Sequence, residues 1–257
     1  MTPRRSLFLF AHQDDEYGAA PWILDELESG ADVACLYLTD GGARVAPAIR
    51  DAESRSVLRS LGVADNGVAF LDDGGKRIAD GALSAQSLEG LAMASSWIDR
   101  NAWTPSRIYS PSYEGGHPDH DAVHLIAAAI ARQSNALDDA WHFALYNAYG
   151  SVRPFFNVLR QLPSRAPSRR ARLTASRRIS LTLLYRRYPS QRRTWLGLLP
   201  GAFLERTVLG RESVVRFELA RLKARPHDGA LLYERFFGKT YAEFAGDVAA
   251  LVALIDR

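Results

Sequence analysis

The amino-acid sequence predicts one α/β domain in which a mostly parallel sheet lies between helices. Three observations support this prediction. The chain has 257 residues, 47% of them hydrophobic and 24% charged, a composition typical of a globular domain with a full core. Short apolar runs alternate with amphipathic stretches through the first half. Clusters of polar residues directly follow several apolar runs, as they do at the carboxyl ends of strands in open parallel sheets.

The individual elements follow from this alternation. Strands are predicted at residues 6–11, 31–38, 68–71, 107–110 and 141–146. Helices are predicted at residues 21–29, 47–61, 84–100 and 118–133, with a closing amphipathic helix at 241–255. Gly62 gives a stop signal for the second helix, and Pro118 suits the first position of the fourth. Regular strand–helix alternation favours a sheet covered on both faces.

A basic segment interrupts the pattern after Gly150. We expect a single domain over residues 1–257 with a basic insertion at about 151–200, in which residues 164–178 form a mobile loop. Between Ala140 and Leu204 there are twelve arginines and no Asp or Glu, so this window alone accounts for the net charge of +3.

Two interpretations of this segment stay open. It is a solvated loop, or it contacts an anionic membrane surface or an anionic substrate. The candidate contacts are the arginines that flank an apolar stretch, namely Arg177, Arg178, Arg186 and Arg187. Nucleic-acid binding is disfavoured, because the arginine doublets lack the regular aromatic interleaving of a single-strand platform.

The sequence also indicates a compartment. No stretch approaches the roughly 18–20 apolar residues of a membrane span, and the apolar run at residues 7–10 is too short for a signal-peptide core. Cys35 is the only cysteine, which excludes an intrachain disulfide. We therefore expect a cytoplasmic protein, with peripheral membrane contact through the arginines as an added hypothesis.

Chemistry-bearing residues follow each of the first four predicted strands. The four clusters are His12-Gln13-Asp14-Asp15-Glu16, Thr39-Asp40-Gly41-Gly42, Asp72-Asp73-Gly74-Gly75, and the run from Tyr113 through His117 and His120 to Asp121. Because the carboxyl ends of parallel strands meet at one edge of a sheet, these loops should converge on one site. Neither a phosphate-binding glycine pattern nor a Gly-x-Ser-x-Gly nucleophile elbow is present.

Histidines and carboxylates in these loops indicate a metal site. Imidazole and carboxylate ligands together suit Zn²⁺, with three protein ligands and one position left open. His117 and His120 lie three residues apart at the start of a predicted helix. Spacing alone also allows His120 with His124, although His124 lies one turn further from the expected site.

Two of the loops carry a family resemblance. Ala11-His12-Gln13-Asp14-Asp15-Glu16 closely resembles the Ala-His-Pro-Asp-Asp-Glu signature of the PIG-L/LmbE-like N-deacetylases, and Gly116-His117-Pro118-Asp119-His120 resembles their second signature. The resemblance covers roughly residues 6–150. It implies one zinc ion per chain, held by His12, Asp15 and His120.

The resemblance also implies roles for other residues. Asp14 would be the general base, and His117 would stabilise the oxyanion or protonate the departing amine. Arg50 and Asp72 would contact the sugar. Two departures stand out: Gln13 replaces the usual proline, and Gly115 stands where some members have a tyrosine.

The implied activity is hydrolysis of the N-acetyl group of an amino-sugar conjugate resembling N-acetylglucosamine, which releases acetate and a free amine. The alternative is a non-catalytic carbohydrate- or lipid-binding protein on the same scaffold. That alternative is disfavoured, because every residue that the chemistry needs is present.

Overall fold

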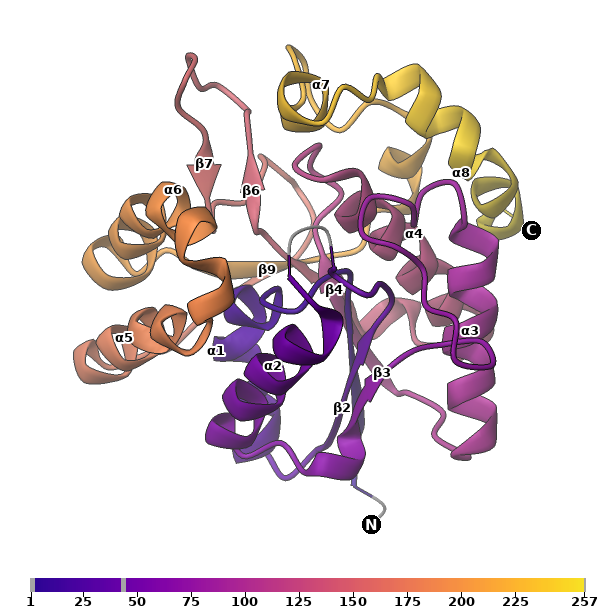
Figure 1. Ribbon diagram of the computed structural model, residues 1–257, viewed down its shortest axis with the longest axis horizontal. Coiled ribbons are helices and arrows are strands. Elements are labelled where there is room, and N and C mark those ends of the chain that lie inside the picture. The colour runs from indigo at the N-terminus through magenta and orange to yellow at the C-terminus, as the bar shows by residue number, and fades with distance from the viewer. Residues whose placement is uncertain (1–2, 43–44, 257) are drawn as a thin grey trace.

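A seven-stranded, mostly parallel sheet forms the centre of the molecule (Figure 1). The computed structural model describes residues 3–42 and 45–256. The strand order is β3-β2-β1-β4-β5-β9-β8. The parallel strands are β1 (Arg5–Phe10), β2 (Asp32–Tyr37), β3 (Val68–Phe70), β4 (Arg107–Pro111) and β5 (Ala140–Phe143); β9 (Ser213–Arg216) and β8 (Ser168–Arg170) pair antiparallel at one edge. The predicted fold class is confirmed.

Helices cover both faces of this sheet. On β1, Leu7 and Leu9 pack in one apolar cluster, whereas Phe8 and Phe10 pack in the other. The first cluster includes side chains from α3 (Ser87–Arg100), α4 (Pro118–Gln133) and α8 (Tyr241–Ile255). The second includes side chains from α1 (Glu16–Glu28) and α2 (Pro47–Leu61). Burial on both faces explains why the strands read as continuous apolar runs rather than as alternating ones.

The helix predictions at 47–61, 118–133 and 241–255 agree with the structure at both ends. The first helix differs, because α1 begins at Glu16 and contains Pro21 in its interior. Its first turn is already closed by bonds from Tyr17 N to Asp14 O and from Gly18 N to Asp15 O. The predicted start of this helix at residue 21 was therefore wrong.

The predicted strand at 141–146 divides into two elements. β5 stays in the main sheet, whereas β6 (Tyr146–Asn147) pairs with β7 (Asn157–Val158) as a separate hairpin. In Figure 1 this hairpin rises above the end of the sheet at which β4 leads into α4.

The basic segment contains regular structure, so the prediction of a loop over residues 164–178 was wrong in part. It contains β8, α5 (Ala175–Thr182) and α6 (Arg192–Ala202), and a π-helical turn, Phe203–Leu209, follows α6. Arg169 on β8 lies 4.9 Å from the Trp141 ring and donates to Asp25. Local sequence could not reveal these partners, because they are distant along the chain.

Among residues 3–42 and 45–256, no helix is both long and apolar enough to cross a membrane.

A buried ion pair ties the π-helical turn to α1. Arg206 is fully buried and donates two hydrogen bonds of 2.7 Å to Glu212. It also donates to Tyr17 O at 2.8 Å, and its guanidinium lies 4.2 Å from the Tyr17 ring. The charge is thus compensated inside the protein, as a buried guanidinium requires.

The β6 hairpin is held against the loop that follows β4. The Glu114 carboxylate accepts from Leu145 N at 2.7 Å, Tyr146 N at 3.0 Å and Asn147 Nδ2 at 2.8 Å. Gly116 permits a close approach there, because a Cβ at this position would lie 2.2 Å from Tyr146 O. The loop before α4 and the β6 hairpin are therefore positioned by one another.

We expect Glu114→Gln to lower the free energy of unfolding by about 1–3 kcal/mol, because the new amide places an N–H group against donors that lose their acceptor. Urea unfolding followed by circular dichroism measures this change. Glu28→Gln is the matched control, since Glu28 is exposed and should shift the value by less than about 0.5 kcal/mol. Equal stability of both variants would contradict the anchoring role of Glu114.

Candidate metal centre and active site

A cavity of about 560 Å³ opens at the carboxyl ends of the parallel strands. Its volume lies within the range of small-molecule sites. The lining side chains come from the loops after β1 and β4, from α2, from the loop before α3, and from the C-terminal half of the chain. They include His12, Asp14, Asp15, Arg50, Asp80, His117, His120, Tyr146, Trp195 and Phe237.

The turn between β1 and α1 is organised by the Asp15 carboxylate. Its Oδ2 accepts hydrogen bonds of 2.9 Å from Ala11 N and His12 N, which leaves Oδ1 facing His120 Nε2 at 3.0 Å. Asp14 has a φ of 132°, a backbone conformation that L-residues rarely adopt. The strained turn holds Asp14 against Arg50, while Asp15 faces His120.

Three ligand atoms converge beside this turn. His12 Nδ1 lies 3.2 Å from His120 Nε2, and the ligand atoms of His12, Asp15 and His120 all lie within 4.8 Å of one another. The other ring nitrogen of His12, Nε2, lies 3.1 Å from Asp119 Oδ2. Donation from Nε2 to this carboxylate leaves the lone pair of Nδ1 facing the other two ligand atoms. The arrangement fits a divalent cation such as Zn²⁺.

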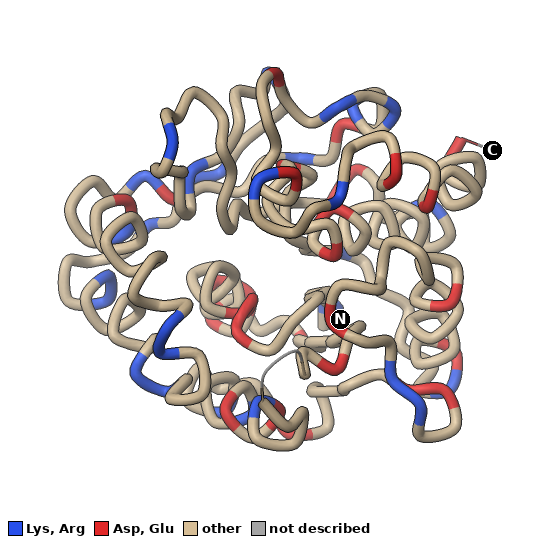
Figure 2. Tube along the Cα trace, turned by 45° about the horizontal axis from the view of Figure 1, so that its top comes forward, with Lys and Arg blue, Asp and Glu red and all other residues tan. Residues whose placement is uncertain are grey.

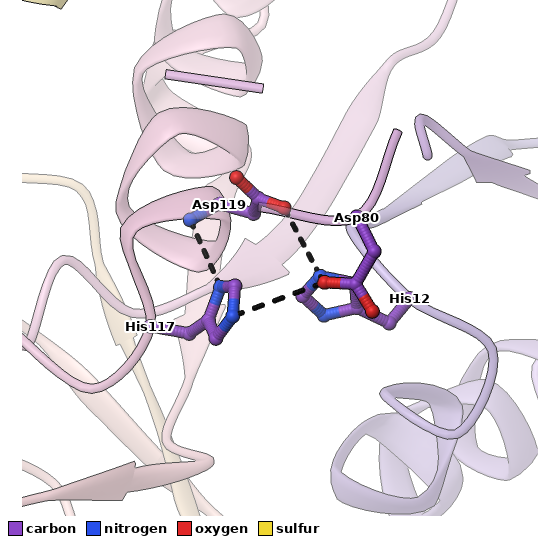
Figure 3. A group of neighbouring side chains, drawn as sticks. All are labelled: His12, Asp80, His117 and Asp119. Carbon is purple, nitrogen blue, oxygen red and sulfur yellow. Dashed lines mark hydrogen bonds and ion pairs between the residues drawn. The ribbon is translucent and has the colours of Figure 1, made fainter. Parts of the chain in front are cut away.

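A second group shares His12 and is drawn in Figure 3. Asp80 Oδ1 lies 3.2 Å from His12 Nε2 and 4.0 Å from His117 Nε2. The Asp119 carboxylate in this group already accepts from Gly81 N at 2.7 Å and Leu83 N at 3.1 Å. Because backbone amides occupy these oxygens, the first group is the better ligand set.

Arg50 connects Asp14 to the surrounding loops. Its guanidinium donates to Gly41 O and Gln13 O, and to Asp14 Oδ1 at 3.1 Å. Burial raises the pKa of the Asp14 carboxyl, and the neighbouring Asp15 raises it further, whereas Arg50 opposes both effects. The carboxylate is thus a stronger proton acceptor than an exposed aspartate, and Arg50 limits its orientation.

His117 is held as a hydrogen-bond donor into the cavity. It caps α4, and its Nδ1 accepts from Asp119 N at 3.2 Å, so the proton of the neutral ring is on Nε2. Burial, with a contribution from His12, lowers the pKa of His117 to about 3. Of the two roles implied by the sequence, stabilisation of an oxyanion by a neutral imidazole agrees better with this geometry than proton donation by an imidazolium.

Comparison with known families bears directly on these residues. A family model described as "PIG-L: GlcNAc-PI de-N-acetylase" matches residues 7–131, which include His12, Asp15 and His120. The predicted resemblance to the PIG-L (LmbE-like) deacetylase family is confirmed over these residues. No curated protein matches the chain by sequence.

Several solved structures share the PIG-L fold of this chain. A deacetylase of the teicoplanin biosynthesis pathway is 18% identical, covers 83% of this chain and 99% of its own, and has a TM-score of 0.61. The A40926 pseudoaglycone deacetylase is 16% identical, with coverages of 83% and 98% and a TM-score of 0.60. N,N'-diacetylchitobiose deacetylase from Pyrococcus horikoshii is 17% identical, with coverages of 84% and 84% and a TM-score of 0.51.

Most of the predicted PIG-L site residues meet in the cavity. The structure brings together all of them except one: His12, Asp14, Asp15, Arg50, His117 and His120. Asp72 is exposed and accepts from Gly75 N at 2.7 Å in a turn outside the cavity, so its predicted place beside the substrate has to be corrected. Asp80, eight residues later in the same loop, is the residue whose carboxylate lines the cavity.

The structure shows what accompanies the two departures from the PIG-L signatures, at Gln13 and at Gly115. Gln13 donates to Asp51 Oδ1 at 2.7 Å, which joins the first loop to α2 without a proline. Tyr113 donates to Ala224 O outside the cavity, whereas Tyr146 from β6 lines it, with its ring centroid 5.3 Å from that of His120. Tyr146 is thus a tyrosine of the site, together with Tyr17, which also lines the cavity.

Sequence reasoning missed several of the lining residues, among them Asp80, Tyr146, Trp195 and Phe237. Asp80 follows an aspartate-rich loop, which was a usable signal. The three aromatic residues lie beyond the strand ends at which ligand loops were sought. Asp119 is part of the second signature, where it lies between His117 and His120 in the sequence. This position was a usable signal that its carboxylate contacts a histidine of the site, and in the structure that histidine is His12.

We expect His120→Ala to lose most bound zinc, because one of three ligands is removed, and His124→Gln to keep it. His124 is buried, with Nδ1 2.9 Å from Pro111 O and 3.1 Å from Ser110 Oγ, and does not line the cavity. Metal analysis of both purified variants, with circular dichroism to confirm folding, decides the matter. Full zinc in folded His120→Ala would refute the ligand set.

Proposed function

We propose that this chain hydrolyses the N-acetyl group of an amino-sugar conjugate with one zinc ion per chain, releasing acetate and a free amine. One observation supports this most strongly: three ligand atoms converge in a cavity beside Asp14, a carboxylate that belongs to neither potential ligand group. The related structures include a deacetylase of the teicoplanin biosynthesis pathway, A40926 pseudoaglycone deacetylase and N,N'-diacetylchitobiose deacetylase, which agrees with the proposal.

His12, Asp15 and His120 would hold the metal. When bound, zinc polarises the amide carbonyl and makes water a better nucleophile at neutral pH. The chain's own groups support this ligand set, since Asp119 orients the His12 ring and two backbone amides orient the Asp15 carboxylate.

Asp14 would accept the proton of the attacking water. A general base must lie within hydrogen-bond reach of that water without being bound to the metal itself. Asp14 meets the second condition, because Arg50 holds its carboxylate at 3.1 Å. The same carboxyl, once protonated, can return the proton to the nitrogen when the carbon–nitrogen bond breaks, so that the amine departs neutral.

His117 would stabilise the tetrahedral oxyanion. Its Nε2–H points into the cavity, while Nδ1 is occupied by the amide of Asp119. A preformed donor of this kind typically contributes about 10²–10³ in rate.

The remaining lining residues suit a sugar. Asp80 and Arg50 offer polar contacts for hydroxyl groups, and the rings of Tyr146, Trp195 and Phe237 offer apolar surfaces for the faces of a pyranose. A non-catalytic sugar-binding protein remains the second candidate. It would bind the same conjugates without releasing acetate, so product analysis separates the two.

The first test is a metal-replete screen of N-acetylglucosamine conjugates with detection of new primary amines. The screen should compare zinc, cobalt, manganese and iron and vary the zinc concentration, since one related structure is a zinc-inhibited form of a teicoplanin deacetylase. The proposal predicts an amine and acetate in equal amounts. Binding without either product, with every metal, would favour the second candidate.

Asp14→Asn should retain zinc and lower kcat by about 10²–10⁴, because only the proton acceptor is removed. Asp15→Asn should instead lose zinc, because the amide is a weaker ligand. Metal analysis and steady-state kinetics of the two variants, side by side, distinguish these roles. Normal turnover by zinc-loaded Asp14→Asn would show that another group is the base.

Asp80→Asn should lower kcat/KM by at least about tenfold, because a carboxylate facing both His12 and the cavity is replaced. Asp72→Asn is the matched control from the same loop and should leave kcat/KM within about twofold, since Asp72 is exposed. Zinc content measured in both variants shows whether the effect acts through the metal. The reverse order of effects would restore Asp72 as the substrate contact.

A further inference from the structure

One side of α6 presents a cationic and apolar stripe to solvent. Arg192, Leu196, Leu199 and Phe203 follow one another at spacings of four, three and four residues, so they share one side of the helix. Leu196 is 78% exposed and Phe203 is 50% exposed, whereas Trp195 on the adjoining side is buried. Exposed large apolar residues in a row on one helix are unusual at a surface that faces only water.

A groove of about 510 Å³ runs beside this stripe. Its lining combines aromatic and aliphatic side chains with two guanidinium groups. The lining residues are Tyr185, Arg186, Tyr188, Pro189, Arg192, Trp195, Leu196 and Leu199. We refer to this groove, together with Arg193 and Phe203, as the α6 surface.

The charge of the α6 surface is not compensated by the protein. Among the described residues, Arg186, Arg192 and Arg193 make no ion pair, and the stretch from Ala140 to Leu204 contains no carboxylate. The nearby Glu53 carboxylate is occupied by Ser190 N and Ser190 Oγ. In Figure 2 the coils at the left, where α5 and α6 lie, carry blue bands.

The structure narrows the set of arginines suggested by the sequence. Arg177 forms an ion pair with Glu28 on α1, and Arg187 donates to Ser56 Oγ on α2, so both are directed toward the protein. Arg186 lies in the groove together with Arg192, which the sequence hypothesis had not singled out.

We propose that the α6 surface docks on an anionic lipid surface. Guanidinium groups pair with phosphate oxygens of lipid headgroups, and the exposed leucine and phenylalanine side chains can enter the boundary between headgroups and acyl chains. Charge complementarity selects anionic lipids, and the apolar stripe beside the arginines selects a lipid surface over a nucleic-acid backbone.

The position of α6 gives this docking a consequence for access to the cavity. Trp195 lines both the cavity and the groove, Thr194 and Leu198 line the cavity from the same helix, and Gln191 lines it from the position directly before the helix. One wall of the cavity would thus stand directly on the lipid surface. The docking goes beyond the proposed function and does not depend on it.

Sedimentation with vesicles tests the proposal. The full chain should sediment with phosphatidylcholine vesicles that contain about 30% phosphatidylglycerol, but not with pure phosphatidylcholine, and about 0.5 M salt should release it. Arg186→Gln with Arg192→Gln should weaken the partition coefficient roughly 30-fold, from about a fivefold effect for each arginine. Arg59→Gln with Arg100→Gln, two exposed arginines elsewhere, is the matched control and should bind like the unchanged protein.

A separate substitution tests whether the apolar part of the α6 surface contributes to vesicle binding. Leu196→Ser should weaken binding about tenfold, whereas Leu88→Ser, at a position on α3 that is 45% exposed, should not. Equal binding to both kinds of vesicle, no binding to either, or unchanged binding by the Arg186/Arg192 variant would overturn the proposal. Binding to duplex DNA that requires Arg186 and Arg192, without vesicle binding, would overturn it in favour of nucleic acid.

Discussion

The contact between Asp15 and His120 is the constraint on which the site depends. These residues are 105 positions apart, yet Asp15 Oδ1 and His120 Nε2 lie 3.0 Å from each other. The sheet makes this possible, because β1 and β4 are hydrogen-bonded neighbours and both end at the same edge. Every other feature of the site is arranged around this pairing, from the strained Asp14 backbone to the histidine cap of α4.

Two acidic residues in the first turn of α4, Asp119 and Asp121, hold neighbouring loops in place. Asp119 accepts from two amides of the loop before α3 as well as from His12, and Asp121 accepts from Glu114 N and Gly115 N. One turn of α4 therefore positions two loops and one histidine of the candidate metal site. Carboxylates with several amide donors are costly to move, which suits a site whose ligand atoms must be held before the metal binds.

The fold and most of the candidate site could be predicted from the sequence for identifiable reasons. Buried parallel strands give continuous apolar runs, and their carboxyl-end loops hold His12, Asp15 and His120 in two short signatures. The contacts that were missed depend on distant pairing. Arg169 gave no local sign of its Trp141 partner, and Asp72 and Asp80 could not be separated without the path of the loop between them. The π-helical turn was likewise hidden, because its stability depends on the buried pair of Arg206 and Glu212.

Residues from two parts of the chain line the cavity, and the family model matches only one of these parts. The candidate metal ligands lie within residues 7–131, where the family model matches, whereas part of the cavity wall is formed by Tyr146, Trp195 and Phe237 from outside that range. Substitutions, insertions or exchanges in that wall can therefore alter which molecules enter without disturbing the ligand atoms. The candidate ligand set and the residues that shape the cavity are thus largely separate along the chain, so the wall is the place at which to alter which molecules the cavity accepts.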